Sequence, residues 1–497
     1  MHSFNQIRLV GFLAFVLHLF VIQFPFVNLE WVFSDAAQNF ASGDIDYMDT
    51  YLAYQANTFG VPILAALLSK ILPIIPVELI PRLLAATSFL LLAEALLRIN
   101  HIINKDKATL LLVILVFLNP LIWTFGGRGT ADLFPASVGI LGVSFFFESI
   151  SIYSRKGILS LFLISVSIIL KYHAVFFVPI IFIEFFIRQN LTISEKIKQS
   201  FLIGTLIFIL PLLYIILVKY QYGFWFVPEK QQSVVNLTGK DFLSNFVGYA
   251  GYLMLLLMPF SLLKIWGVFS EIKKPFVLFA IILGVFIVGY LGIKSQEEMN
   301  FGPLDRFLSE RFIGGCFTVL SLWTGVLLYS AYASYNKQSA QRYMASIIVG
   351  VLTFILILSL ARPTQRYLMF ILPLSYFFVI SMDIYRYKFL VYLGILMCIF
   401  TNLYILSSQY VQGDAAKKML FALEQKGLVQ VTKPTRINGH VGKAFFQYRS
   451  HPKEYMVFDG ANPKALFSVT SSMLLSHKTY SLIPFDKNHL RVGARAP

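Results

Sequence analysis

Residues 275–293 read PFVLFAIILGVFIVGYLGI and contain no charged side chain. Lys273 and Lys274 precede this stretch, and Lys294 follows it. A helix that crosses the hydrocarbon core of a bilayer needs about 20 mostly apolar residues. The stretch is therefore long enough to span a membrane, and its flanking lysines mark where the helix would reach the two polar interfaces.

The composition extends this interpretation to the whole chain. Hydrophobic residues make up 57% of the 497 positions and charged residues 13%, whereas soluble domains carry about 25% charged residues. A disordered chain is excluded, because disorder requires low hydrophobicity and high charge. The sequence predicts an all-α polytopic membrane protein with about thirteen transmembrane helices, near residues 7–24, 80–99, 108–125, 133–152, 157–170, 172–188, 199–219, 246–266, 275–293, 312–334, 343–361, 366–384 and 388–409. The pair at 157–188 is also compatible with one broken hairpin, because each half is short.

The loops indicate an orientation. Short loops rich in Lys and Arg lie on the cytoplasmic side, and alternate loops of this chain carry such residues, among them Arg155 and Lys156. The first loop on the other side, from Pro25 to about Thr58, has no Lys or Arg. We therefore expect a multi-pass membrane protein with a cytoplasmic N-terminus. The first apolar run has no cleavage site after it and is expected to be a retained helix.

Two further segments have a distinct composition. Residues 59–76 are apolar but contain three prolines, and a crossing there would invert every later loop, so we expect a helix lying in the outer interface. After Tyr410, strand-length runs at 428–432, 455–458 and 480–483 alternate with helical patterns at 415–426 and 463–475. This alternation predicts a small α/β domain. The expected domains are residues 1–410 in the membrane and 411–497 outside the cytoplasm.

The first outer loop supplies an acidic candidate, Asp35. The alternative is that Ser34 or Asp35 caps a short helix over residues 36–41. Asp44, Asp46 and Asp49 cluster around a glycine in a turn-like segment and fit the role of solvated loop acids better.

The second outer loop reads GGRGTAD from Gly126 to Asp132. Its three glycines permit an irregular backbone and close approach of a ligand, and such backbone is tolerated at membrane depth where it lines a cavity. Arg128 and Asp132 place a phosphate-binding type of cation and a carboxylate in one loop. The alternative is an Arg–Asp pair that closes a tight turn.

Two later segments carry cations at outer helix ends. Lys171 stands between two apolar runs, where it needs water, a headgroup or a partner; the alternative is a side chain that snorkels to the interface. His173 on its own is more often a satisfied buried histidine. Arg362 and Arg366 flank a very short turn, where they are suited to bind a lipid phosphate or to anchor the helices at the interface.

These segments together resemble the GT-C superfamily of integral-membrane glycosyltransferases, which includes protein O-mannosyltransferases and lipid A aminoarabinose transferases. The resemblance rests on the order and sidedness of SDAAQNFASGDIDY (34–47), FGVPILAALLSKILPIIPVELIPRLLAA (59–86), GGRGTADLFP (126–135), KYHAVFFVP (171–179) and RPTQRYLMFILP (362–373). Asp35 stands where the family has an acid after the first helix, and Asp132 where a second acid is usual. The first loop lacks the family's acidic pair, so Asp35 stands alone there.

The resemblance implies a transferase of the bacterial inner membrane that takes a sugar from a polyprenyl-phosphate carrier and moves it to a glycan, lipid or protein acceptor at the outer face, usually with inversion. In such an enzyme Asp35 is the catalytic base and Asp132 positions the acceptor or a bound cation. The donor phosphate would be bound by Arg128, Lys171, His173, Arg362 and Arg366. Two acids alone leave open whether a divalent cation takes part, and no other cofactor is implied.

Two other classes remain as alternatives: a transporter or flippase of lipid-linked saccharides, and an O-antigen-type polymerase or ligase. Transporters usually place charges near the bilayer midplane, whereas here the charges cluster in outer loops and at helix ends. The net charge of +16 fits the positive-inside bias and anionic headgroups. No nucleic-acid-binding motif accompanies it.

Overall fold

The computed structural model describes residues 2–22, 30–43, 45, 58–105, 108–187, 192–226, 241–262, 275–292, 309–333, 338–360, 364–380, 388–425, 480–486 and 489–494. Its α-helices are α1 (His2–Val21), α2 (Glu30–Ser42), α4 (Gly60–Ile71), α5 (Ile80–Asn104), α6 (Thr109–Leu118), α7 (Pro120–Gly126), α8 (Leu133–Glu148), α9 (Arg155–Leu170), α10 (Phe177–Ile187), α11 (Ile193–Tyr222), α13 (Phe242–Leu256), α15 (Pro275–Gly292), α16 (Glu310–Ala333), α17 (Gln338–Leu358), α18 (Leu372–Ile380) and α19 (Lys388–Gln425). Short 3-10 helices are η1 (Val77–Leu79), η2 (Tyr172–Phe176) and η4 (Gln365–Phe370), and the strands are β1 (Tyr480–Asp486) and β2 (His489–Ala494).

The protein is a polytopic helical membrane protein. Within the described ranges, five helices are long and apolar enough to cross a membrane, or six if the bent pair α6–α7 counts as one span. Shorter apolar helices, α8 and α13 among them, stand beside these. Each of the thirteen predicted runs contains a helix. The predicted helical bundle is thus confirmed, whereas the number of thirteen complete spans stays a prediction.

The predicted run 108–125 is broken in the middle. Helices α6 and α7 meet at an angle of 69°, because Pro120 cannot continue a helix and disfavours the helical conformation of Asn119 before it. The Asn119 side chain accepts a hydrogen bond from Leu121 N (3.0 Å) and donates to Leu256 O (2.7 Å) and Tyr376 Oη (2.9 Å). The break is therefore stabilised by contacts to other helices.

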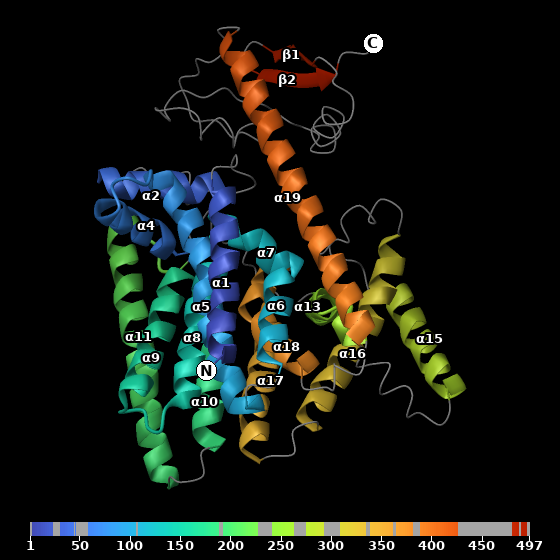
Figure 1. The fold of residues 1–497 in the computed structure, drawn as a ribbon. Coiled ribbons are helices and arrows are strands. Elements are labelled where there is room, and N and C mark those ends of the chain that lie inside the picture. Colours follow the sequence, from blue (N-terminus) through green and yellow to red (C-terminus); the bar gives the residue numbers. More distant parts are fainter. Residues whose placement is uncertain are drawn as a thin grey trace.

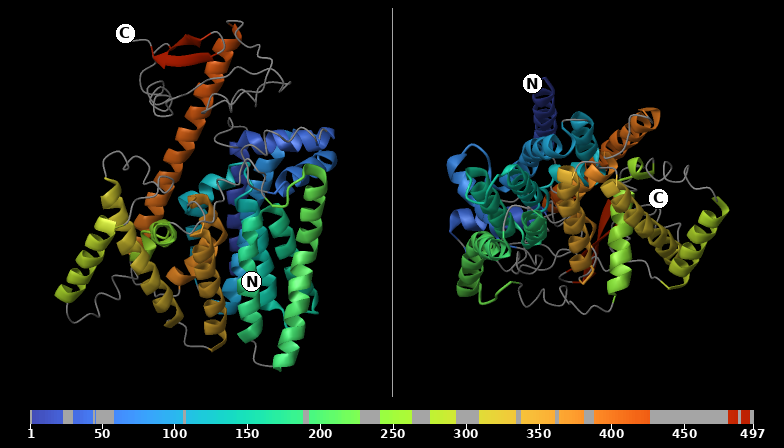
Figure 2. Two further views of the ribbon diagram at one scale, coloured as in Figure 1. Left: turned by 180° about the vertical axis from the view of Figure 1, so that it is seen from behind. Right: turned by 90° about the horizontal axis from the view of Figure 1, so that it is seen from below.

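Helices α2 and α4 lie across one end of the bundle, as the two side views show (Figures 1 and 2). We call this the α2/α4 end. The sequence predicted α4 as a helix lying flat; for the α2 region it predicted an outer loop, with a short helix over residues 36–41 as the alternative. Helix α2 forms because Val32, Phe33, Ala36 and Ala37 are buried along one side of it, at the spacing of an amphipathic helix. It begins at Glu30, so neither Ser34 nor Asp35 is its N-cap.

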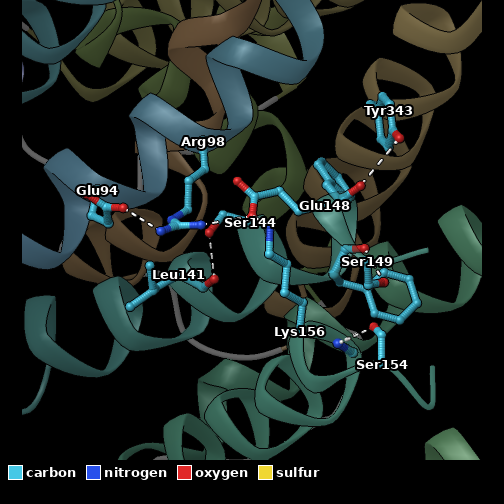
Figure 3. Close-up of polar contacts among 12 residues, drawn as sticks. Glu94, Arg98, Leu141, Ser144, Glu148, Ser149, Ser154, Lys156 and Tyr343 are labelled. Atoms are coloured by element: carbon cyan, nitrogen blue, oxygen red, sulfur yellow. Dashed lines mark hydrogen bonds and ion pairs between the residues drawn. The ribbon is translucent and has the colours of Figure 1, made fainter. Parts of the chain in front are cut away.

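The opposite end of the bundle is joined by an ion-pair network (Figure 3), in which Arg98 on α5 lies between Glu94 and Glu148. Arg98 donates to Glu94 Oε1 (2.6 Å) and to Glu148 Oε2 (2.8 Å). Glu148 also binds Lys156 Nζ (2.7 Å), and Glu94 binds Arg8 Nε (3.0 Å). The network connects α1, α5, α8 and α9, and we call it the Arg98 network.

Helix α19 continues without a break past residue 410 to Gln425 and rises beyond the α2/α4 end (Figure 1). Strands β1 and β2 pair antiparallel, with Tyr480 opposite Ala494, and β1 covers the predicted strand at 480–483. The predicted elements at 428–432, 455–458 and 463–475 lie outside the described residues. A boundary at 410 therefore falls within a helix, and the division into two domains stays a prediction.

Candidate functional site

The α2/α4 end contains a buried ion pair between residues far apart in sequence. Asp132 precedes the first residue of α8, and Lys171 follows the last residue of α9. The Lys171 ammonium binds Asp132 Oδ1, and the two side chains are only 1% and 2% exposed. Thr58 just before α4 donates to Leu170 O (2.7 Å), which fixes the chain beside Lys171. Two predicted site residues are thus brought together.

Aromatic rings from η4 complete the surroundings of Lys171. Its Nζ lies 5.1 Å from the ring centroid of Tyr367 and 6.0 Å from that of Phe370, within the range of cation–π attraction. The His173 ring lies against Tyr367, with the centroids 4.0 Å apart. The buried Nδ1 atom of His173 has no hydrogen-bond partner among the described residues. His173 is therefore not the satisfied buried histidine of the alternative interpretation.

Arg128 and Arg366 also belong to this cluster. Arg128 interacts electrostatically with Glu30, Asp132 and Arg366, and Arg366 acts on both Asp132 and Lys171. Both arginine side chains are half-buried.

The 3-10 helix that carries Arg366 is held in place from α13. Thr364 N donates to Tyr249 Oη (2.9 Å), and Tyr252 Oη donates to Gln365 Oε1 (2.9 Å). Four of the predicted donor-binding residues therefore lie around Asp132: Arg128, Lys171, His173 and Arg366.

Sequence reasoning missed a second buried ion pair, between Glu30 and Arg82. Arg82 binds both carboxylate oxygens, Nε to Oε1 at 2.8 Å and Nη2 to Oε2 at 3.0 Å, and the two side chains are 0% and 2% exposed. Arg82 also donates to Ile22 O (2.8 Å), and Gly129 N donates to Glu30 Oε1 (2.7 Å). The pair ties α1, α2, α5 and the 127–132 loop together. The available signal was a lone Arg directly after Pro81 at the start of an apolar helix.

The glycines of the GGRGTAD segment allow close packing against α5, whereas the predicted approach of a ligand stays a prediction. A Cβ on Gly126 would lie 2.2 Å from Cε2 of Phe89, and one on Gly129 would lie 3.1 Å from Arg82 N. A side chain at Gly126 would therefore push the loop off α5.

The remaining predicted residues are less completely described. Asp35 lies in α2, five positions after Glu30, and its side chain is outside the described residues. Arg362, Asp44, Asp46 and Asp49 also lie outside them.

A metal ion was left open by the sequence. In the described part of the chain, no three His, Cys, Asp or Glu side chains come together as a metal site requires. Glu30 and Asp132 each already bind a cationic side chain. As arranged here, these two acids do not fit a divalent cation.

The charges of the cluster decide what it can bind. Among the described residues, four cations and two acids meet there: Arg82, Arg128, Lys171 and Arg366 with Glu30 and Asp132. Within this described set, the excess of two positive charges lies among buried and half-buried groups, where electrostatic attraction is screened less than in water. Arginine and lysine in such numbers are suited to an anion with several acceptor oxygens, such as a phosphate.

No protein-family model and no curated protein matches the sequence. Two solved structures are similar, those of ArnT from Cupriavidus metallidurans bound to undecaprenyl phosphate and in the apo state, each with 13% identity and a TM-score of 0.44. The matches cover 94% and 95% of this chain and 87% and 89% of the ArnT chains. The alignments therefore extend over nearly the whole of this chain and most of each ArnT chain.

Proposed function

We propose that this protein is a membrane glycosyltransferase that moves a sugar from a polyprenyl-phosphate donor to a cell-envelope acceptor, with inversion at the anomeric carbon. The observation that carries the proposal is the cluster of four cations and two acids at one end of a membrane bundle. A donor of this class has a phosphate for the cations and a hydrocarbon chain that stays in the bilayer. In the proposed orientation the α2/α4 end faces outward from a bacterial inner membrane.

The cations serve the leaving group. As the bond between the anomeric carbon and the phosphate oxygen breaks, its electron pair stays with the phosphate, which gains negative charge. Arg128 and Arg366 are assigned to stabilise that charge, because fixed cations around a water-poor site act most strongly on charge that develops in the transition state. Arg362 is assigned to the same group from its sequence position alone. The unpartnered Nδ1 of His173 is assigned to the donor as a further polar contact.

The acceptor hydroxyl needs a base. Its oxygen forms the new bond to the anomeric carbon, and its proton passes to a carboxylate within hydrogen-bond reach. Glu30 is bound to Arg82 and Gly129, and Asp132 is bound to Lys171, so both acids already have cationic partners. Asp35 is on the same helix as Glu30 and is proposed as the base. Asp132 is proposed as a positioning group beside it.

The proposal is tested by comparing cell-envelope glycans and lipids, by mass spectrometry, between cells with and without the protein. We expect one glycan modification to disappear and its polyprenyl-phosphate sugar to accumulate. The purified protein in nanodiscs should then transfer that sugar and release the polyprenyl phosphate. If the protein moves the lipid-linked sugar across a vesicle membrane without cleaving it, the protein is a flippase and the proposal is wrong.

A further inference from the structure

The two buried acids of the site are held in different ways. Glu30 uses both carboxylate oxygens on Arg82 and also accepts from the backbone of Gly129, and such a bidentate arginine pair is fixed in geometry. In the described structure, the contact between Asp132 and Lys171 is through Oδ1 of the carboxylate. A lysine ammonium is a compact charge on a flexible stem and can change partners by rotating. The Glu30–Arg82 pair is therefore fixed in geometry, whereas Lys171 can exchange Asp132 for another anion.

The surroundings of Lys171 favour a second anion beside it. Arg366 acts electrostatically on both members of the pair, and Arg128 interacts with Asp132 from the neighbouring loop. The rings of Tyr367 and Phe370 lie over the ammonium, so the lysine stays stabilised while its carboxylate partner is exchanged. An anion drawn in by the excess positive charge would compete with Asp132 for Lys171.

We propose that Asp132 is a displaceable partner of Lys171: the donor phosphate takes over the ammonium on binding, and Asp132 takes it back when the carrier phosphate leaves. This inference rests on the proposed function. The donor phosphodiester carries one negative charge, whereas the phosphate monoester released after transfer carries about 1.5 to 2 at pH 7. The product is thus attracted more strongly than the donor, and the return of Asp132 to Lys171 removes one cation from it. Asp132 is a positioning residue that acts through Lys171.

The test is Asp132→Asn, which keeps the shape of the side chain and removes its charge. The probe is undecaprenyl phosphate, titrated against the purified protein in phosphatidylcholine nanodiscs. We expect the variant to bind the probe at least about tenfold more tightly than the wild type, because Lys171 no longer has a competing carboxylate. Saturating probe should also raise the melting temperature more in the variant, since the phosphate replaces the missing charge.

Turnover gives an independent readout. With excess donor, the steady-state rate of Asp132→Asn should fall because the carrier phosphate leaves slowly. A single turnover with the protein in excess should be affected much less. A merely structural role of Asp132 would lower both rates together.

Two control variants separate the proposal from a general loss of stability. Glu184→Gln removes another fully buried acid, which pairs with Arg342 at 3.1 Å on α10 and α17. It should lower the melting temperature without changing the affinity for undecaprenyl phosphate. Adding Lys171→Met to Asp132→Asn should abolish the gain in affinity, because that gain depends on the freed ammonium.

The outcomes are distinguishable. If the wild type binds undecaprenyl phosphate but Asp132→Asn binds it equally or more weakly, the exchange of partners is wrong and the proposed function stands. The exchange of partners is also wrong if the variant with both Asp132→Asn and Lys171→Met keeps the higher affinity for undecaprenyl phosphate. It is wrong as well if Asp132→Asn does not fold and undecaprenyl phosphate does not restore folding. If the wild type neither binds the probe nor transfers any polyprenyl-phosphate sugar, the proposed function itself fails.

Discussion

Asp35 is the acid on which the proposed chemistry depends most. Replacing it with Asn keeps its volume but removes its capacity to accept a proton, and a positioned base contributes about 10²–10⁴-fold. We expect Asp35→Asn to lower the transfer rate at least about a hundredfold while binding of undecaprenyl phosphate persists. Asp44→Asn and Asp46→Asn should stay near the wild-type rate. If Asp35→Asn keeps its turnover and one of the other two abolishes it, the base has been assigned to the wrong acid.

A second prediction concerns the contribution of the site's arginines to donor binding. Hydrogen bonds to charged groups contribute about 1.5–3 kcal/mol each, so Arg128→Ala and Arg366→Ala should each weaken donor binding by roughly tenfold to a hundredfold. Arg362→Ala and Lys171→Ala are expected to act in the same direction. Lys156→Ala, a half-exposed lysine of the Arg98 network, is the control and should leave donor affinity unchanged. Unchanged affinity in all four site variants would refute the phosphate site.

Single residues of the site could be found from the sequence, but their pairing could not. Arg128, Asp132, Lys171 and Arg366 were identified because charged side chains are costly beside apolar runs. The sequence offered Arg128, four positions away, as the local partner of Asp132. The ion pair instead joins Asp132 to Lys171, 39 positions away. That contact depends on how the ends of α8 and α9 meet, which no local pattern reports.

At the level of elements, the apolar runs predicted helices closely, because length and hydropathy decide whether a helix suits a bilayer. For example, the expected run 275–293 corresponds to α15 (Pro275–Gly292). Of helix α2, the sequence predicted only a short helix over residues 36–41, as an alternative to a loop, because the acids of this segment suggested exposure to solvent. The buried side of α2 faces other helices across the end of the bundle. Asn119-Pro120 signalled the α6–α7 break in the sequence, but only the partners Leu256 and Tyr376 show why the break is stable.

The Arg98 network gives a prediction at the scale of helix packing. Arg98 is 24% exposed and binds acids on both α5 and α8, whereas Arg8 is 58% exposed and binds only Glu94 in the described structure. Exposed ion pairs contribute little, and partly buried networks contribute more. We expect Arg98→Met to lower the melting temperature in nanodiscs by several degrees and Arg8→Met by clearly less, with donor affinity unchanged in both. Equal shifts would mean that the network does not couple the helices.

At the scale of the whole molecule, the two ends of the bundle differ in the residues and elements that they hold. The site, α2 and α4 occupy one end, and α19 carries the chain past that same end (Figure 1). The opposite end holds Arg98, Lys156 and their acidic partners (Figure 3). Lys and Arg in short loops favour the cytoplasmic side. If the loops orient the chain as proposed, the end that holds Arg98 and Lys156 faces the cytoplasm and the site faces the outside.

Two exposed isoleucines allow this orientation to be measured. Ile74 follows α4 and is 94% exposed, and Ile150 follows α8 at the opposite end and is 95% exposed. In a background with Cys316 and Cys398 replaced by Ser, a membrane-impermeant maleimide added to intact spheroplasts should label Ile74→Cys but not Ile150→Cys. Both variants should be labelled after lysis, which controls for reactivity, and a reporter fused after Pro497 should be active only outside the cytoplasm. If only Ile150→Cys is labelled in intact spheroplasts, the site lies on the cytoplasmic face. The donor would then be a sugar carrier on that face, and the proposed transfer to an outer acceptor would be wrong.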